Sequence, residues 1–243
     1  MTSYKGKKIL GLINARGGSK GVPGKNKKLL LGKPLINYSI DAGLSASCLS
    51  NLIVSTDDEE IAQIAKSAGA DVPFLRPEIL ATDTAKQIDA IIHAVQFMEN
   101  CENIKYDYIC LLQPTCPLRS AEDIKGSIDL IIKENCDSVI TVTNVGGRHP
   151  RTLYTTDKDQ KLTPFMENNL SGVQRQDFED FFWRTGSVYV MARDVVIEHK
   201  SLYGETTCGY YVTEERCFNI DSPFDWDLCQ AYLSYKYDLN TSE

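Results

Sequence analysis

Residues 8–26 read KILGLINARGGSKGVPGKN, an apolar run that continues into a loop rich in glycine and lysine. The apolar character of residues 8–14 is typical of a buried strand. Glycines in the loop allow the backbone to approach a phosphate chain, and main-chain N–H groups can then line the concavity. Arg16, Lys20 and Lys25 surround the same loop with positive charge, which matches the charge of a triphosphate. The stretch therefore predicts a phosphate-binding loop that follows the first strand.

A solvated basic loop would have the same composition. We favour phosphate binding because the loop lies at the carboxyl end of the first strand, where open α/β sheets bind their ligands. The order of residues matches neither the Walker A loop nor the GxGxxG dinucleotide fingerprint, so the sequence predicts a different kind of nucleotide site.

Outward from this stretch, short β-type runs alternate with longer helical patterns. Strands are predicted at residues 51–55, 108–113, 138–143 and 186–191, and helices at residues 35–47, 59–68 and 83–100, from 120 onward and from 222 onward. Such alternation predicts an α/β fold with a doubly wound, mostly parallel sheet. We expect one domain over residues 1–243. Within it, the polar residues 144–182 break the alternation and predict an insertion outside the main sheet: a small subdomain, an oligomerisation arm or a lid.

Composition narrows the classes of function. The formal net charge of −7 argues against a general nucleic-acid surface, which usually needs a basic face. No apolar run approaches the ~18 residues that a membrane span requires, and the N-terminus is short and polar, so we predict a cytoplasmic protein without membrane contact. The eight cysteines include no CxxC pair, which favours reduced thiols over disulfides or a zinc site.

The loop ARGGSKGVPGKN, residues 15–26, resembles the signature of the CMP-sialic acid synthetases, also called acylneuraminate cytidylyltransferases. The resemblance continues, in family order, through GKPLI (32–36), STDDEEI (55–61), LRP (75–77), DTA (83–85), LQPTCPLR (112–119), CDSV (136–139) and NIDSPFDW (219–226). These segments span nearly the whole chain. The resemblance implies a Rossmann-like nucleotidyltransferase fold and a reaction that joins CTP to a nine-carbon acidic sugar, with pyrophosphate as the second product.

The resemblance also implies which residues hold the nucleotide. Arg16, Lys20 and Lys25 would bind the CTP phosphates, and Arg16 and Lys25 would act in catalysis together with Asp221. Asn26 would contact cytosine or ribose, and Arg76 would read the base. The remaining nucleotide contacts would come from Ala15, Gly17, Ser19, Gln87 and Thr115, of which Gln87 stands where the family often has serine.

Asp221 is the candidate ligand for Mg²⁺, the cofactor that the family implies. Family members usually have Asp-Ile-Asp where this chain has Asn219-Ile220-Asp221. In a strand, alternate side chains face the same side, so Asn219 would still point with Asp221 and would offer a carbonyl oxygen without charge. Asp225 is a further candidate ligand. Its place in the first turn of the predicted final helix also suits a partner for the helix dipole.

The resemblance implies that Gln113, Arg175, Gln176, Arg184 and Tyr189 contact the sugar, whose carboxylate suits arginine as a bidentate partner. The arm of residues 144–182 would serve dimerisation. Arg151 would reach from it into the neighbouring subunit's site, so a homodimer is expected.

Two other hypotheses remain open at this point. One is a nucleotidylyltransferase for another sugar, such as the eight-carbon acid Kdo, or for another nucleotide. The other is a non-catalytic nucleotide-sugar binding protein. Asn219 supports this hypothesis because it stands where the family usually has a carboxylate for the metal.

Overall fold

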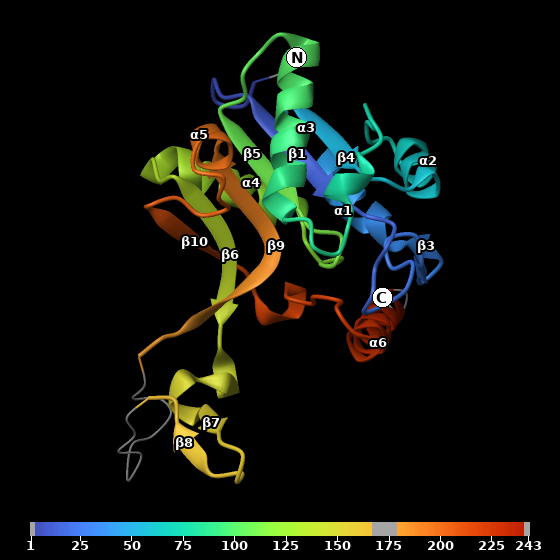
Figure 1. Ribbon diagram of the computed structural model, residues 1–243. Coiled ribbons are helices and arrows are strands. Elements are labelled where there is room, and N and C mark those ends of the chain that lie inside the picture. The colour runs from blue at the N-terminus through green and yellow to red at the C-terminus, as the bar shows by residue number, and fades with distance from the viewer. Residues whose placement is uncertain (1–2, 167–178, 241–243) are drawn as a thin grey trace.

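A six-stranded sheet organises the computed structural model, which describes residues 3–166 and 179–240 (Figure 1). Its strand order is β10-β6-β9-β5-β1-β4. The strands span Ile9–Asn14 (β1), Asn51–Ser55 (β4), Tyr108–Leu112 (β5), Ser138–Asn144 (β6), Phe182–Ala192 (β9) and Thr207–Tyr211 (β10). β1 pairs in parallel with β4 and β5, and β10 with β6, whereas β9 runs antiparallel between β5 and β6. The predicted mostly parallel α/β sheet is confirmed.

Helices cover both faces of the sheet, and in Figure 1 α3 crosses in front of it while α1 and α4 lie behind. They span Leu35–Ser45 (α1), Glu59–Ser67 (α2), Gln87–Glu102 (α3), Ala121–Glu134 (α4), Arg193–Ile197 (α5) and Pro223–Asn240 (α6). Along β1, Ile9 and Ile13 belong to the core under α1, α2 and α4, and Leu10 and Leu12 to the core under α3. Because successive strand residues face opposite sides, a near-continuous apolar strand is what two covered faces require.

Local capping fixes two of the helices in this frame. Asp58 accepts hydrogen bonds from the N–H groups of Glu60 and Ile61 at the start of α2, at 2.8 and 3.1 Å. Ser120 and Asp123 form a reciprocal capping box at the start of α4. Both features follow from the sequence pattern of a small polar residue before an apolar helical stretch.

Three predicted elements differ from the structure. The helix expected from residue 83 begins at Gln87, because residues 83–86 form a loop and the Asp83 carboxylate pairs with Arg16 and Lys20. The strand expected at 186–191 extends over Phe182–Ala192, and β10 was not predicted from the sequence. The strand geometry assumed for Asn219–Asp221 is wrong: this segment has no regular secondary structure.

Short elements complete the described chain. A small hairpin, β2 (Leu29–Leu30) and β3 (Lys33–Pro34), leads from the glycine-rich loop into α1. Single 3₁₀ turns span Glu78–Leu80, Gly146–Arg148, Pro150–Thr152 and Glu214–Arg216. No helix among residues 3–166 and 179–240 is long and apolar enough to cross a membrane.

Between β6 and β9 the chain leaves the main sheet. An antiparallel hairpin of β7 (Tyr154–Thr156) and β8 (Leu162–Pro164) projects away from it at the bottom of Figure 1. Every residue of these two strands is exposed to solvent. The segment therefore adds surface and contributes little to the core that positions the cavity described below.

Candidate active site

A cavity of about 280 Å³ lies at the carboxyl ends of β1 and β5. Asn14 ends β1, Gln113 follows β5, and Gln87 opens α3 at its edge. The full lining comprises Asn14, Arg16, Ser19, Lys20, Gly21, Lys25, Asn26, Gln87, Gln113, Pro114, Thr115 and Asp221. The fold thus brings most of the predicted nucleotide residues into one space, together with Gln113 and the predicted metal ligand. Of the predicted nucleotide residues, Ala15, Gly17 and Arg76 do not line the cavity.

The glycine-rich loop is held in place by its own backbone and by the segment after β4. Asn26 donates from Nδ2 to the carbonyl of Arg16 at 2.9 Å, which closes the loop on itself. The N–H of Gly17 donates to Oδ1 of Asp57 at 3.1 Å, and the N–H of Ala15 donates to the carbonyl of Ser55 at 3.0 Å. These contacts fix the course of the loop through groups of the protein itself. Ala15 lies behind the cavity lining, whereas Asn26 both closes the loop and lines the cavity.

Each cation of the loop faces a carboxylate. Lys25, only 8% exposed, donates to the carbonyl of Ile220, and its Nζ lies 3.4 Å from Oδ1 of Asp221. Arg16 and Lys20 both pair with Asp83, at 3.0 and 2.7 Å. The Lys25 contact joins the N-terminal loop to the C-terminal segment. Three cations of the loop therefore face two carboxylates, because Arg16 and Lys20 share Asp83.

Arg76 lies behind the cavity wall. Its guanidinium donates to Oγ of Ser55 at 3.0 Å, to the Ser55 carbonyl at 2.5 Å and to Oδ1 of Asn14 at 3.2 Å. Burial lowers the pKa of Arg76 to about 10, so it remains charged at neutral pH. Its partner Asn14 does line the cavity, although it was not among the residues predicted from the sequence. The signal was present as the amide that ends an otherwise apolar strand.

Arg119 is a second buried arginine that the sequence analysis did not assign. It donates to the carbonyls of Gln113 and Ser187, at 2.5 and 2.8 Å, and to Oγ of Ser39 at 2.9 Å. Burial lowers the pKa of its guanidinium. Arg119 thus fixes the turn that carries Gln113 and Thr115 into the cavity.

The candidate metal ligands occupy one short segment. The carbonyl of Thr115 accepts a hydrogen bond from the N–H of Ile220 at 2.9 Å, which holds this segment at the cavity. Asn219 donates from Nδ2 to Oδ2 of Asp221, so these two side chains do point together although no strand is present. Within the described part of the chain, no group of three or more His, Cys, Asp or Glu side chains could hold a metal alone.

Asp225 serves the start of α6. Its Oδ2 accepts from the N–H groups of Asp221 and Ser222, at 3.1 and 2.8 Å, and from Oγ of Ser222 at 2.8 Å. The N–H of Asp225 donates back to Oγ of Ser222 at 3.2 Å. This reciprocal pattern is a capping box, and it engages Oδ2 of the Asp225 carboxylate.

The predicted sugar residues are less concentrated than the nucleotide residues. Arg184 donates to the hydroxyl of Tyr203 and is exposed, while Tyr189 is buried and burial raises its pKa. Neither lines the cavity. Arg151 lies in the 3₁₀ turn Pro150–Thr152, on the segment that leaves the main sheet. Arg175 and Gln176 lie outside the described residues.

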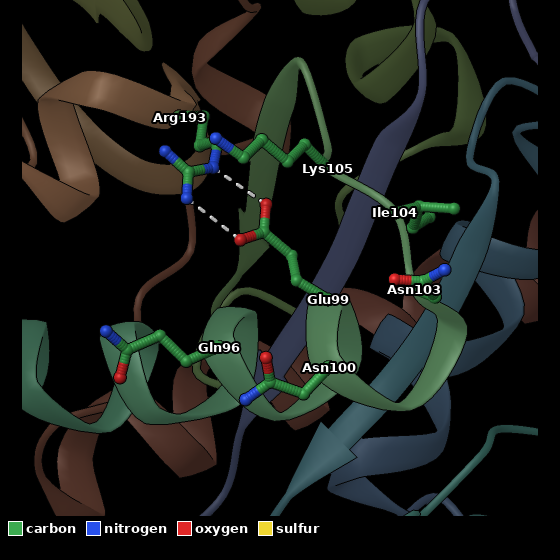
Figure 2. Close-up of a pocket in the computed structure, with 7 residues that line it drawn as sticks. All are labelled: Gln96, Glu99, Asn100, Asn103, Ile104, Lys105 and Arg193. Atoms are coloured by element: carbon green, nitrogen blue, oxygen red, sulfur yellow. Dashed lines mark hydrogen bonds and ion pairs between the residues drawn. The ribbon is translucent and has the colours of Figure 1, made fainter.

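A second hollow, of about 560 Å³, lies at the other end of α3 (Figure 2). Figure 2 shows the Glu99 carboxylate and the Arg193 guanidinium facing each other across it, with contacts of 2.7 and 2.9 Å. Oε1 of Glu99 also accepts from the N–H of Tyr106 at 3.1 Å. This pair joins α3 to α5, so we assign it a structural role.

Comparison with known proteins agrees with the geometry. The family model described as cytidylyltransferase matches residues 10–221. The CMP-N,N'-diacetyllegionaminic acid synthase of Legionella pneumophila is 36% identical over 228 residues, which cover 93% of this chain and 96% of that protein. The N-acylneuraminate cytidylyltransferase of Escherichia coli is 32% identical over 222 residues, which cover 91% of this chain but 51% of that protein.

Among solved structures, a CMP:2-keto-3-deoxy-manno-octonic acid synthetase complexed with CTP has the same fold. Its TM-score is 0.69 at 16% identity, with 94% of this chain and 99% of that chain covered. The fold, the cationic loop at the carboxyl edge of the sheet and the match over residues 10–221 lead to one assignment. This chain belongs to the cytidylyltransferase family.

Proposed function

We propose that this protein transfers CMP from CTP to a nine-carbon acidic 2-keto sugar and releases pyrophosphate. The names of the relatives support the substrates, since they include synthases for legionaminic, N-acylneuraminic and pseudaminic acid derivatives. One observation carries the proposal. The cations of the N-terminal loop and the carboxylate of Asp221 line the same cavity at the edge of the sheet.

The reaction is a displacement at phosphorus. The anomeric hydroxyl of the sugar attacks the α-phosphorus of CTP, the new C–O–P linkage forms, and the bond to the β-phosphate oxygen breaks as pyrophosphate leaves in line. The hydroxyl proton goes to solvent or to the departing phosphate. Arg16, Lys20 and Lys25 oppose the negative charge that grows on the leaving group, and the rigid loop positions the phosphates. No protein nucleophile is required.

The donor set at the cavity fits Mg²⁺. Asp221 offers an exposed carboxylate, 66% accessible at its side chain, and Asn219 lies in hydrogen-bond contact with it. Mg²⁺ is usually held by one or two carboxylates together with substrate phosphates and water, so a single aspartate suffices. Asp221 would hold the ion, with Oδ1 of Asn219 as a neutral second donor. When bound, the ion would neutralise phosphate charge. Asp225 fits this role less well because its carboxylate caps α6.

Nucleotide contacts follow from position in the cavity. Gln87, Asn14 and Ser19 line the cavity and would meet the base or the ribose. Arg76 would act through Asn14, to which it donates at 3.2 Å. Gln113 and Thr115 line the cavity on the turn after β5, which Arg119 ties to Ser187 of β9. We place the sugar towards β9, where Arg184 and Tyr189 are candidates for its carboxylate and hydroxyl groups.

We propose that the chain acts as a cytoplasmic homodimer. The segment that leaves the main sheet exposes Leu153, Tyr154, Leu162 and Phe165, each between 45% and 66% accessible. Large apolar side chains gathered on a thin projection favour burial against a second copy. Arg151 on the same segment would then approach the neighbour's cavity. Light scattering of the purified chain tests this, and a monomer at micromolar concentration would contradict it.

A substrate panel tests the reaction itself. CTP, UTP, GTP and ATP are each combined with N-acetylneuraminate, legionaminate, pseudaminate and Kdo in the presence of Mg²⁺, and pyrophosphate and product mass are measured. We expect product with CTP and at least one nine-carbon acid. If Kdo is the only sugar that reacts, or if another nucleotide reacts in place of CTP, the proposed substrates are wrong. Tight CTP binding without pyrophosphate from any acid would favour a nucleotide-sugar binding protein, the hypothesis that Asn219 keeps open.

A further inference from the structure

The carboxylate of Asp83 bridges two cations that line the cavity. Its Oδ1 lies 3.0 Å from Nη1 of Arg16, and its Oδ2 lies 2.7 Å from Nζ of Lys20. The Arg16 guanidinium also donates to the carbonyl of Thr82 at 3.2 Å. The hydrogen bond from Lys20, with help from Arg16, lowers the pKa of Asp83, so the group is ionised at neutral pH. The Asp83 carboxylate therefore forms ion pairs with two of the loop's cations, Arg16 and Lys20.

The contact can open without disturbing the core. Asp83 lies in the connection between the 3₁₀ turn Glu78–Leu80 and α3, and its neighbours Thr82 and Thr84 are exposed. Its own side chain is 47% accessible and that of Lys20 is 73% accessible. Ion pairs this exposed contribute little to stability, so a competing anion can replace the carboxylate.

Lys25 differs from the other two cations. Its side chain is 10% accessible and donates to the carbonyl of Ile220, so it is anchored within the site. Arg16 and Lys20, by contrast, are held by a side chain that carries one negative charge. A ligand with several phosphate charges matches these two cations better than one carboxylate does. A ligand that carries a single phosphate and lies elsewhere in the cavity leaves Asp83 in place.

We propose that Asp83 is an affinity determinant that competes with the pyrophosphate part of CTP for Arg16 and Lys20. This inference rests on the proposed function, because it takes these two cations to hold the β- and γ-phosphates. Its consequence is selective: CTP and pyrophosphate must displace the carboxylate, whereas CMP need not. After transfer, the return of Asp83 to the cations favours departure of pyrophosphate.

Calorimetric titration of D83N tests the competition. Pyrophosphate, CTP and CMP are titrated separately into the full chain without sugar or Mg²⁺. We expect D83N to bind pyrophosphate and CTP roughly two- to tenfold more tightly than the wild type, the range expected for removing two exposed ion pairs. The affinity for CMP should change by less than about twofold.

D89N is the matched control, because it makes the same change in net charge from an exposed position in the first turn of α3. Equal tightening in D83N and D89N would overturn the proposal in favour of a general charge effect. Unchanged or weaker binding in D83N would overturn it as well, since Asp83 would then organise the cations or play no part.

K20A separates this proposal from the proposed function. If K20A binds CTP as tightly as the wild type, Lys20 does not hold the phosphates and the phosphate role proposed for it is wrong. If K20A weakens CTP binding but D83N fails to strengthen it, the site stands and the role of Asp83 is refuted.

Discussion

Replacing Gly21 by alanine probes the contact between the N-terminal loop and the C-terminal segment. A Cβ at Gly21 would lie 2.0 Å from the carbonyl oxygen of Asp221, whereas Cβ contacts below 3.0 Å are essentially never seen. The loop and Asp221 must therefore separate by about 1 Å. Overpacking of this kind destabilises by roughly 1–3 kcal/mol, which lowers the Tm of a chain this size by roughly 2–12 °C. A displacement of ~1 Å at reacting groups lowers kcat/KM by about 10²-fold.

Gly18→Ala is the matched control, because a Cβ there would meet nothing within 4 Å. Neither Gly18 nor Gly21 has a positive φ, so backbone strain does not complicate the comparison. Thermal unfolding and pyrophosphate release are measured for both variants. We expect Gly18→Ala to resemble the wild type. If Gly21→Ala resembles it equally, the two segments do not approach closely and the shared site is refuted.

Three further substitutions test individual parts of the site. Lys25→Ala should lower turnover by ~10²-fold or more, as for the loss of one electrostatic stabiliser, and a folded variant with unchanged turnover would remove Lys25 from the mechanism. Asn219→Asp adds a carboxylate beside Asp221 and should lower the Mg²⁺ concentration for half-maximal turnover severalfold; an unchanged requirement in a metal titration would show that Asn219 is no ligand. Asp225→Ala should destabilise the fold by ~1 kcal/mol at pH 7. Burial opposes the ionisation of Asp225, but hydrogen bonds from Ser222 and Asp221 outweigh it and lower its pKa below 3.8. The difference from wild type should therefore be complete above pH 3.8 and vanish as the pH falls through the lowered pKa, and a constant difference in urea unfolding would contradict this.

The main sheet could be predicted because its signals are local. The apolar run of β1 serves two cores, with Ile9 and Ile13 on one side and Leu10 and Leu12 on the other. The caps at Asp58 and Ser120 mark helix starts by residue type alone. The start of α3 was misplaced for the opposite reason. Asp83 suits a helix N-terminus by type, but its carboxylate binds two cations distant in sequence.

Strand β10 was not predicted because its side chains alternate only between exposed and half-buried. Thr207–Tyr211 pairs with β6 only at the edge of the sheet, and none of its residues is fully buried. An edge strand needs no continuous apolar run, so its sequence resembles that of a polar connection. The antiparallel direction of β9 could not be predicted from its own residues either. The direction of a strand depends on the path of the chain that leads to it, here the segment between β6 and β9.

Placement of Asp221 is the part of the site that no local pattern encodes. Its segment has no regular secondary structure and is held by Lys25, which lies 195 residues from Ile220 in the sequence. The second tie is the hydrogen bond from Ile220 to the carbonyl of Thr115, itself fixed on a turn that Arg119 binds. Residue types alone predicted a cationic loop, and only the family resemblance joined it to a distant aspartate. Physically, that union depends on the buried Lys25, on the backbone hydrogen bond from Ile220, and on the packing of Ile220 with Val22 and Trp226 in a buried apolar cluster. These contacts join residues far apart in the chain, so no local pattern could reveal them.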